Sequence, residues 1–193
     1  MVHTVNLPVE SITHIINIDN PNVLVPIENV LEYFEKDAGK NTDKSIRSMY
    51  TNTTVVDKQI NYMSDVYYIT SLTKETIKNT NKIKYFKIHV KYFPSEKEYD
   101  LILPSYVKLF SRTAKTFVPV EFARKSDILI DYTGNIVQIL SNEPVEDYTP
   151  SEYYSIQIFN NNENPITFYL NGIFCNVYYN NFDIKDGEVL ETE

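Results

Sequence analysis

Side chains that commonly do chemistry are sparse in this sequence. It contains three histidines, His3, His14 and His89, and a single cysteine, Cys175. A zinc site is typically signalled by His, Cys or acidic ligands at short spacings, and the sequence has neither an HExxH nor a CxxC pair. We therefore interpret the histidines as surface or turn residues and predict no metal ligands.

Motifs for nucleophilic catalysis and nucleotide binding are missing as well. The sequence lacks the G-x-S-x-G turn of serine hydrolases, a Walker loop and the G-x-G-x-x-G fingerprint, and it has only 4 glycines. Cys175 alternates with Ile173 and Val177 in an apolar run, whereas a reactive thiol needs an accessible, electropositive setting. We predict that Cys175 packs in the core, and that the chain has no catalytic residue and no cofactor.

Two groups of acidic side chains could support acid-base or calcium chemistry. Asp127 and Asp131 stand four residues apart along a predicted strand, about 13 Å at ~3.3 Å per residue, which is too far for the paired carboxylates of a glycosidase. We interpret both as caps of strand ends. Glu96, Glu98 and Asp100 fit a solvated face, and they could form a Ca²⁺ site only if carbonyl oxygens completed it.

The net charge of the chain restricts the class of partner. The formal charge is -8 at pH 7 and the pI is near 4.9, so the chain lacks the clustered Lys and Arg that neutralise phosphates. The basic run 82–91 is an exception, but Lys87, His89 and Lys91 alternate there with apolar residues, as on a half-buried strand. We place these three side chains on a solvated strand face and predict no nucleic-acid partner.

The elements that must position these groups are best defined around Asn171-Gly172. This dipeptide separates two apolar-alternating runs and favours a two-residue type I′ hairpin turn, which needs positive φ at both positions. The turn fixes the pairing of the two strands. Leu170 then faces Ile173, Phe168 faces Cys175 and Ile166 faces Val177, which makes one side of the hairpin wholly apolar.

The other side of this hairpin mixes polar and aromatic residues. Such a face suits water or a partner, and tyrosine is enriched at protein interfaces. We therefore predict an interface in this region. Its candidate residues are Tyr169, Phe174, Tyr178 and Tyr179.

Short strands recur through the rest of the chain, separated by Pro, Asn and Gly. They predict a mainly β fold, an antiparallel β-sandwich or a jelly-roll-like barrel, with a second hairpin at 131–135. One N-terminal α-helix is expected at about 26–38, where apolar residues follow helical spacing. Periodicity leaves 105–112 open between helix and strand, and residues 141–154 are expected to form a surface loop. We divide the chain into an N-terminal arm and helix, 1–53, and a β-rich core, 54–193, with a C-terminal meander and an acidic tail.

Composition and predicted architecture together resemble small virion proteins of low-GC phages, although no family motif carries the resemblance. Asn, Ile and Lys recur, and there are 16 tyrosines. We expect a non-enzymatic structural or assembly protein, such as a capsid decoration, neck or tail component, that contacts protein subunits in a homo-oligomer or hetero-assembly. The alternative is a β-sandwich module that binds carbohydrate or a host receptor.

Signals for export or membrane insertion are not evident. The first residues lack the basic start and continuous apolar run of a secretory signal, and no stretch approaches the ~18 apolar residues of a transmembrane helix. We expect no membrane partner, and a location in a virion if a phage encodes the protein or in the cytoplasm otherwise.

Overall fold

Antiparallel β-structure dominates the molecule, as the sequence predicts. The computed structural model describes residues 2–17, 20–36, 46–52, 63–76, 83–159, 166–177, 182–185 and 188–191. The strands in these ranges form three four-stranded and two two-stranded sheets. Every strand pair among them is antiparallel, so the expectation of a mainly β fold is confirmed.

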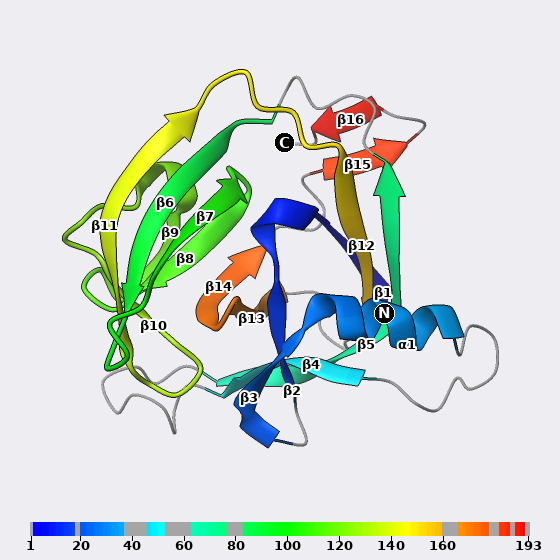
Figure 1. The fold of residues 1–193 in the computed structure, drawn as a ribbon, viewed down its shortest axis with the longest axis horizontal. Coiled ribbons are helices and arrows are strands. Elements are labelled where there is room, and N and C mark those ends of the chain that lie inside the picture. The colour runs from blue at the N-terminus through cyan, green and yellow to red at the C-terminus, as the bar shows by residue number, and fades with distance from the viewer. Residues whose placement is uncertain are drawn as a thin grey trace.

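The first sheet has the strand order β1, β12, β5, β4, with β1 at Val2–Pro8, β12 at Glu152–Phe159, β5 at Met63–Thr76 and β4 at Ile46–Asn52. Helix α1, Ile27–Lys36, lies across it (Figure 1) and buries Ile27, Val30 and Leu31. The Glu28 carboxylate accepts hydrogen bonds from Tyr154 on β12 and Lys74 on β5, at 2.5 and 3.1 Å. Apolar spacing and these polar bonds together hold the helix on the sheet.

The second sheet has the order β10, β11, β6, β7, with β10 at Ile128–Ile130, β11 at Ile136–Val145, β6 at Tyr85–Tyr92 and β7 at Glu98–Pro104. The second predicted hairpin is confirmed here, because β10 and β11 pair and Gly134 has a φ of 86°. The expected loop 141–154 is partly wrong. After a register shift between Ile139 and Ser141, β11 continues to Val145 because it pairs with β6.

The third sheet has the order β13, β14, β8, β9, with β13 at Ile166–Leu170, β14 at Ile173–Val177, β8 at Val107–Ser111 and β9 at Thr116–Pro119. Segment 105–112, which the sequence left undecided between helix and strand, therefore folds mostly as a strand.

The smaller elements are β2 (His14–Asn17), β3 (Asn20–Pro26), β15 (Phe182–Lys185), β16 (Glu188–Glu191), and the short 3-10 helices η1 (Val9–Ser11) and η2 (Val120–Phe122). Residues 53–62 lie outside the described part of the chain, so the division at residue 53 stays a prediction.

The β13–β14 hairpin has the register that the sequence predicts. Ile166 pairs with Val177, Phe168 with Cys175 and Leu170 with Ile173, and the turn residues Asn171 and Gly172 have φ values of 52° and 86°. Cys175 is fully buried in the main core, and burial raises the pKa of its thiol. The prediction of a packed cysteine is confirmed.

The opposite side of the hairpin corrects the predicted interface. Tyr169 is 2% exposed and Phe174 is fully buried, because β8 and β9 bring Phe110 and Phe117 against them. The ring centroids of Phe110 and Phe117 lie 5.6 and 5.4 Å from that of Phe174. A second layer of the protein itself covers this face, so Tyr169 and Phe174 cannot meet a partner. The other two candidates, Tyr178 and Tyr179, lie outside the described residues.

Candidate ligand pocket

Two hairpin turns that are distant in sequence meet near the centre of the molecule. The backbone N–H of Tyr132, in the β10–β11 turn, donates to the carbonyl oxygen of Gly172 at 2.8 Å, and Asp131 forms a β-bridge with Ile173. The hydroxyl of Tyr92, at the end of β6, donates to the carbonyl oxygen of Asn171 at 3.0 Å. These bonds fix three hairpin ends against one another.

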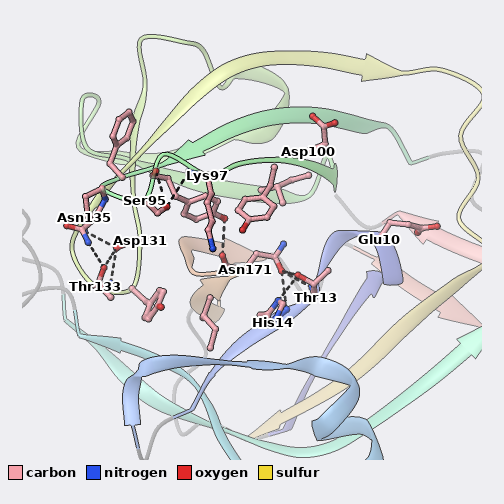
Figure 2. Close-up of a pocket in the computed structure, with 17 residues that line it drawn as sticks. Glu10, Thr13, His14, Ser95, Lys97, Asp100, Asp131, Thr133, Asn135 and Asn171 are labelled. Atoms are coloured by element: carbon pink, nitrogen blue, oxygen red, sulfur yellow. Dashed lines mark hydrogen bonds between the residues drawn. The ribbon is translucent and has the colours of Figure 1, made fainter.

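The side chain of Asn171 adds the N-terminal segment to this junction (Figure 2). Its Oδ1 accepts from the Thr13 N–H at 2.7 Å, the Thr13 hydroxyl at 3.1 Å and the His14 N–H at 3.3 Å. Its Nδ2 donates to the carbonyl oxygen of Ser11 at 3.0 Å. Asn171 is only 8% exposed, so its amide is a buried polar group with its bonds satisfied.

A pocket of about 580 Å³ opens between these segments. Its walls come from the N-terminal segment, the β6–β7 turn, the β10–β11 turn and the tip of the β13–β14 hairpin, and they combine aromatic rings with polar groups. The residues that line it include Glu10, His14, Tyr92, Phe93, Lys97, Tyr99, Asp100, Asp131, Tyr132, Asn135 and Asn171.

Asp131 is the buried acid of this pocket. The residue is 6% exposed, and its Oδ1 accepts from the N–H of Thr133 at 2.9 Å, the Thr133 hydroxyl at 2.7 Å and the N–H of Asn135 at 2.8 Å. Burial raises the pKa of Asp131, and the hydrogen bonds from Thr133 and Asn135 oppose that rise. No described Lys, Arg or His lies within 4.0 Å of its carboxylate.

The aromatic wall is built around Tyr92. Burial raises the pKa of the Tyr92 hydroxyl, and the nearby charge of Asp131 raises it further. The rings of Tyr92 and Tyr99 meet edge to face with centroids 5.5 Å apart. Tyr99 is 48% exposed, so it forms the outer part of the wall.

The other acids of the pocket already have partners. Glu10 accepts a hydrogen bond from the Tyr148 hydroxyl at 2.6 Å. Asp100 lies 2.6 Å from His89 Nδ1 and 3.7 Å from the Lys87 ammonium.

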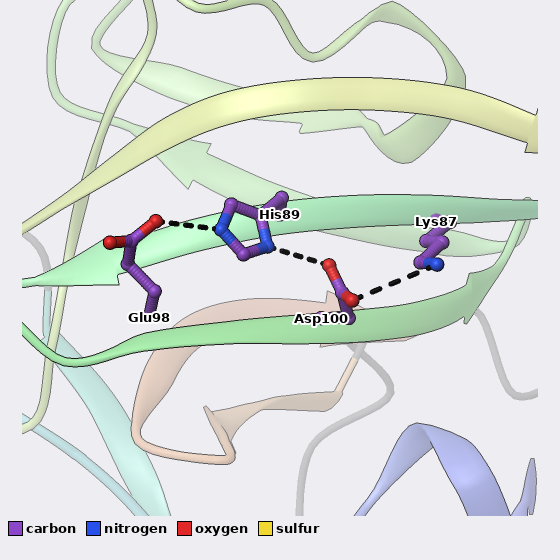
Figure 3. Close-up of polar contacts among 4 residues, drawn as sticks. All are labelled: Lys87, His89, Glu98 and Asp100. Atoms are coloured by element: carbon purple, nitrogen blue, oxygen red, sulfur yellow. Dashed lines mark hydrogen bonds and ion pairs between the residues drawn. The ribbon is translucent and has the colours of Figure 1, made fainter.

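His89 is held between two carboxylates on the exposed face of β6 and β7 (Figure 3). Its Nε2 lies 2.8 Å from Glu98 and its Nδ1 lies 2.6 Å from Asp100. Because both ring nitrogens face acceptors, the hydrogen bonds to Glu98 and then Asp100 raise the pKa of His89 and favour the imidazolium. The predicted solvated face of Lys87 and His89 is confirmed, and it pairs with the acidic face of β7.

Metal binding has no support in the part of the chain that the structure describes. No three His, Cys, Asp or Glu side chains converge there in a way that could hold an ion. Glu98 and Asp100 lie on opposite nitrogens of the same ring, so they cannot share a cation with that ring.

Sequence reasoning found Asp131 but not its surroundings. Asp127 caps its loop as predicted, accepting from the Ser111 hydroxyl at 2.7 Å and the Arg124 N–H at 2.9 Å. Asp131 caps its turn as predicted, yet it also lines a pocket. The sequence identifies Asn171 as a turn residue, but nothing in it places Asn171 or Tyr92 beside Asp131, because the contact between Tyr92 and Asn171 spans 79 residues.

Comparisons with known proteins give a distant structural likeness. No protein family and no curated protein matches the sequence. An intein-like domain from Clostridium thermocellum covers 91% of this chain and 96% of its own, at 10% identity and a TM-score of 0.48. The gp41-1 intein covers 90% of this chain and 97% of its own, at 13% identity and a TM-score of 0.44. A substituted form of the same intein has 14% identity and a TM-score of 0.43.

These comparisons correct the functional expectation. The similar structures are inteins and an intein-like domain rather than capsid, neck or tail proteins, which contradicts the expectation of a non-enzymatic virion component. The carbohydrate- or receptor-binding alternative loses two of its four aromatic residues, since Tyr169 and Phe174 are buried. With TM-scores below 0.5, the likeness assigns no reaction to this chain. None of the helices in the described ranges is long and apolar enough to cross a bilayer.

Proposed function

We propose that the chain binds a small organic ligand in the pocket between the four segments. A volume of about 580 Å³ lies within the range of about 300 to 1,000 Å³ that is typical of ligand sites. Aromatic rings supply apolar walls, and a few polar groups at turn tips supply orientation. This combination is the usual composition of such sites.

The charge of Asp131 carries the proposal. A turn of this kind needs only a side-chain oxygen that accepts backbone N–H groups, and a neutral Asn supplies one equally well. Burying a carboxylate costs free energy unless a cation or strong hydrogen bonds compensate it. The turn explains the acceptor at Oδ1 but not the charge, so a ligand is the natural partner of that charge.

The walls of the pocket are fixed before a ligand arrives. Tyr92 is held by Asn171, and the backbone of Tyr132 is held by Gly172. Asn171 is in turn held by Ser11 and Thr13. Such preorganisation lowers the entropy lost on binding.

Fragment screening by NMR on the full chain tests this proposal. We expect some fragments to shift the amide signals of residues 92–99 and 131–135 in a saturable way, and Tyr99→Ala to weaken their binding about tenfold. Phe122→Ala is the matched control, because Phe122 is 60% exposed and does not line the pocket. If every fragment hit mapped elsewhere, or if Tyr99→Ala and Phe122→Ala had equal effects, the proposal would be wrong.

A further inference from the structure

We propose that the ligand carries a cation, a primary ammonium or guanidinium group, and that this group takes Asp131 as its counter-ion. The inference rests on the proposed function, since it requires that the pocket bind a small molecule. It adds the chemical class of that molecule.

The balance of charges on the pocket wall favours a cation. The acidic residues among those that line the pocket, Glu10, Asp100 and Asp131, outnumber the basic ones, Lys97 and His14. The carboxylate of Asp100 is turned to His89 and Lys87 on the exposed face. The chain as a whole has a charge of -8, which attracts cations from a distance and repels anions.

Among these acids, Asp131 is the one that is both buried and without a charged partner, since Glu10 is exposed and accepts only from the Tyr148 hydroxyl. Asp100 faces both His89 and Lys87 across the β6–β7 pair. Asp131 is buried whereas Asp100 is exposed, and yet no described cation lies within 4.0 Å of Asp131. A charge-charge contact is stronger where water is scarce, so Asp131 gains more from a bound cation than Asp100 does.

The hydrogen bonds that Thr133 and Asn135 donate to Asp131 reach one of its two carboxylate oxygens. The three donors from Thr133 and Asn135 all reach Oδ1, and none of these bonds uses Oδ2. An ammonium group offers three donors and a guanidinium five, and both form their strongest bonds with carboxylates. A cation at Oδ2 would complete the carboxylate without displacing the turn.

The aromatic wall suits the same chemistry. Tyr92, Phe93, Tyr99 and Tyr132 all line the pocket. The negative face of an aromatic ring attracts a cation within about 6 Å of the ring centre. Rings and carboxylate therefore select the same class of ligand, and both disfavour an anion.

Lys97 provides an internal test of the inference. Its ammonium lines the pocket but lies more than 4.0 Å from Asp131, since the two form no ion pair. A ligand cation would be repelled by Lys97. Replacing this lysine with a neutral residue should strengthen cation binding, whereas a ligand held by shape alone would show no such gain.

Titrations with three probes of similar shape, followed by NMR on the full chain, test the inference. Benzylamine carries a cation, benzyl alcohol is neutral and benzoate is an anion. We expect benzylamine to shift residues 131–135 in a saturable way, and benzyl alcohol to bind roughly tenfold more weakly because it lacks a charged hydrogen bond. Benzoate should not bind. Asp131→Asn should weaken benzylamine binding about tenfold while leaving benzyl alcohol unchanged, and Lys97→Gln should strengthen benzylamine binding about twofold.

The outcomes separate this inference from the proposed function. If benzylamine and benzyl alcohol bind equally well, and Asp131→Asn changes neither, the pocket binds ligands but the cation inference is wrong. If no probe and no fragment binds in the pocket, the proposed function fails and the inference fails with it. Unchanged amide signals outside 128–136 in the Asp131→Asn spectrum establish that this variant keeps its fold.

Discussion

The two turns that meet at the pocket hold their buried polar side chains in opposite ways. Asn171 in the β13–β14 turn is neutral, and its amide bonds to Ser11, Thr13 and His14, up to 160 residues away. Asp131 in the β10–β11 turn is an acid, and the bonds to its Oδ1 come from Thr133 and Asn135, within four residues. The first side chain joins distant parts of the fold, whereas the second is capped locally and keeps an unpaired charge.

This difference distinguishes a buried polar side chain that stabilises the fold from one that could bind a ligand. Both residues are almost equally buried, at 8% and 6% exposure, so burial alone does not distinguish them. The partners do, because a neutral group that binds remote backbone atoms stabilises the fold, while a charge that its own turn leaves uncompensated is available to a ligand.

The largest expected effect comes from removing the remote bonds of Asn171. Asn171→Gly keeps the positive φ of the turn but deletes the amide, and we expect it to lower the free energy of unfolding by about 2 to 3 kcal/mol, since the buried Ser11 carbonyl and the part-buried Thr13 N–H lose a partner. Chemical denaturation measures the loss. Asn135→Gly is the control at the other turn, where the side chain is exposed and bonds only locally, and its effect should stay within about 0.5 kcal/mol. Equal losses would remove the contrast between the turns.

A smaller effect is expected at the glycine of the same turn. Gly172 has a φ of 86°, and a Cβ there would meet the Tyr132 ring at 3.0 Å. Gly172→Ala should lower the free energy of unfolding by about 1 to 2 kcal/mol through backbone strain, plus the displacement of Tyr132. Gly134 at the other turn has the same φ of 86°, so Gly134→Ala measures the cost of backbone strain without the displacement of Tyr132. A thermal melt in which Gly134→Ala is the more harmful change would contradict this account.

Asp131→Asn should have little effect on stability at acidic pH and a favourable one near neutrality. Burial raises the folded-state pKa of Asp131 above the unfolded value of about 3.9, so the folded state binds the extra proton between those two pKa values, and stability falls as pH rises through that interval. The substitution removes this pH-dependent penalty, which we expect to be below about 1 kcal/mol. Denaturation curves of both proteins from about pH 3 to 7 measure it. A variant that is less stable than the parent at neutral pH would indicate that the charge serves the fold.

The smallest effect is expected on the exposed face of β6 and β7, away from both turns. Hydrogen bonds to Glu98 and Asp100 raise the folded-state pKa of His89 above the unfolded value of about 6.5. The stability that these bonds add is therefore full below about pH 6.5 and is lost as pH rises through the folded-state pKa. His89→Asn should flatten the pH dependence of stability in this range. Lys87→Gln should leave the slope unchanged, because it keeps His89 and both of the carboxylates that bond to it, and a changed slope would contradict the assignment to His89.

Local patterns predicted the local features of this fold well. The register of the Asn171-Gly172 hairpin follows from a two-residue turn and period-two alternation, and the helix face of Ile27, Val30 and Leu31 follows from helical spacing. The same patterns could not show what covers a strand face. Tyr169 and Phe174 look like an exposed aromatic surface until Phe110 and Phe117 are placed against them.

The pocket was beyond sequence reasoning for the same physical reason. A turn motif identifies Asp131 as an acceptor for its own backbone, and nothing within a few residues reveals that Tyr92 and Asn171 lie beside it. Contacts between remote segments depend on how the three sheets are placed, which local spacing does not encode.

The bonds between Asn171 and the N-terminal segment also order events during synthesis. Ser11 and Thr13 leave the ribosome early, but their partner emerges some 160 residues later. Because domains fold as the chain emerges and remote contacts form late, the N-terminal segment lacks its Asn171 partner until the β13–β14 hairpin has emerged, and the pocket is complete only then. Nascent chains that end before residue 171 therefore contain Asp131 and its turn, but no pocket.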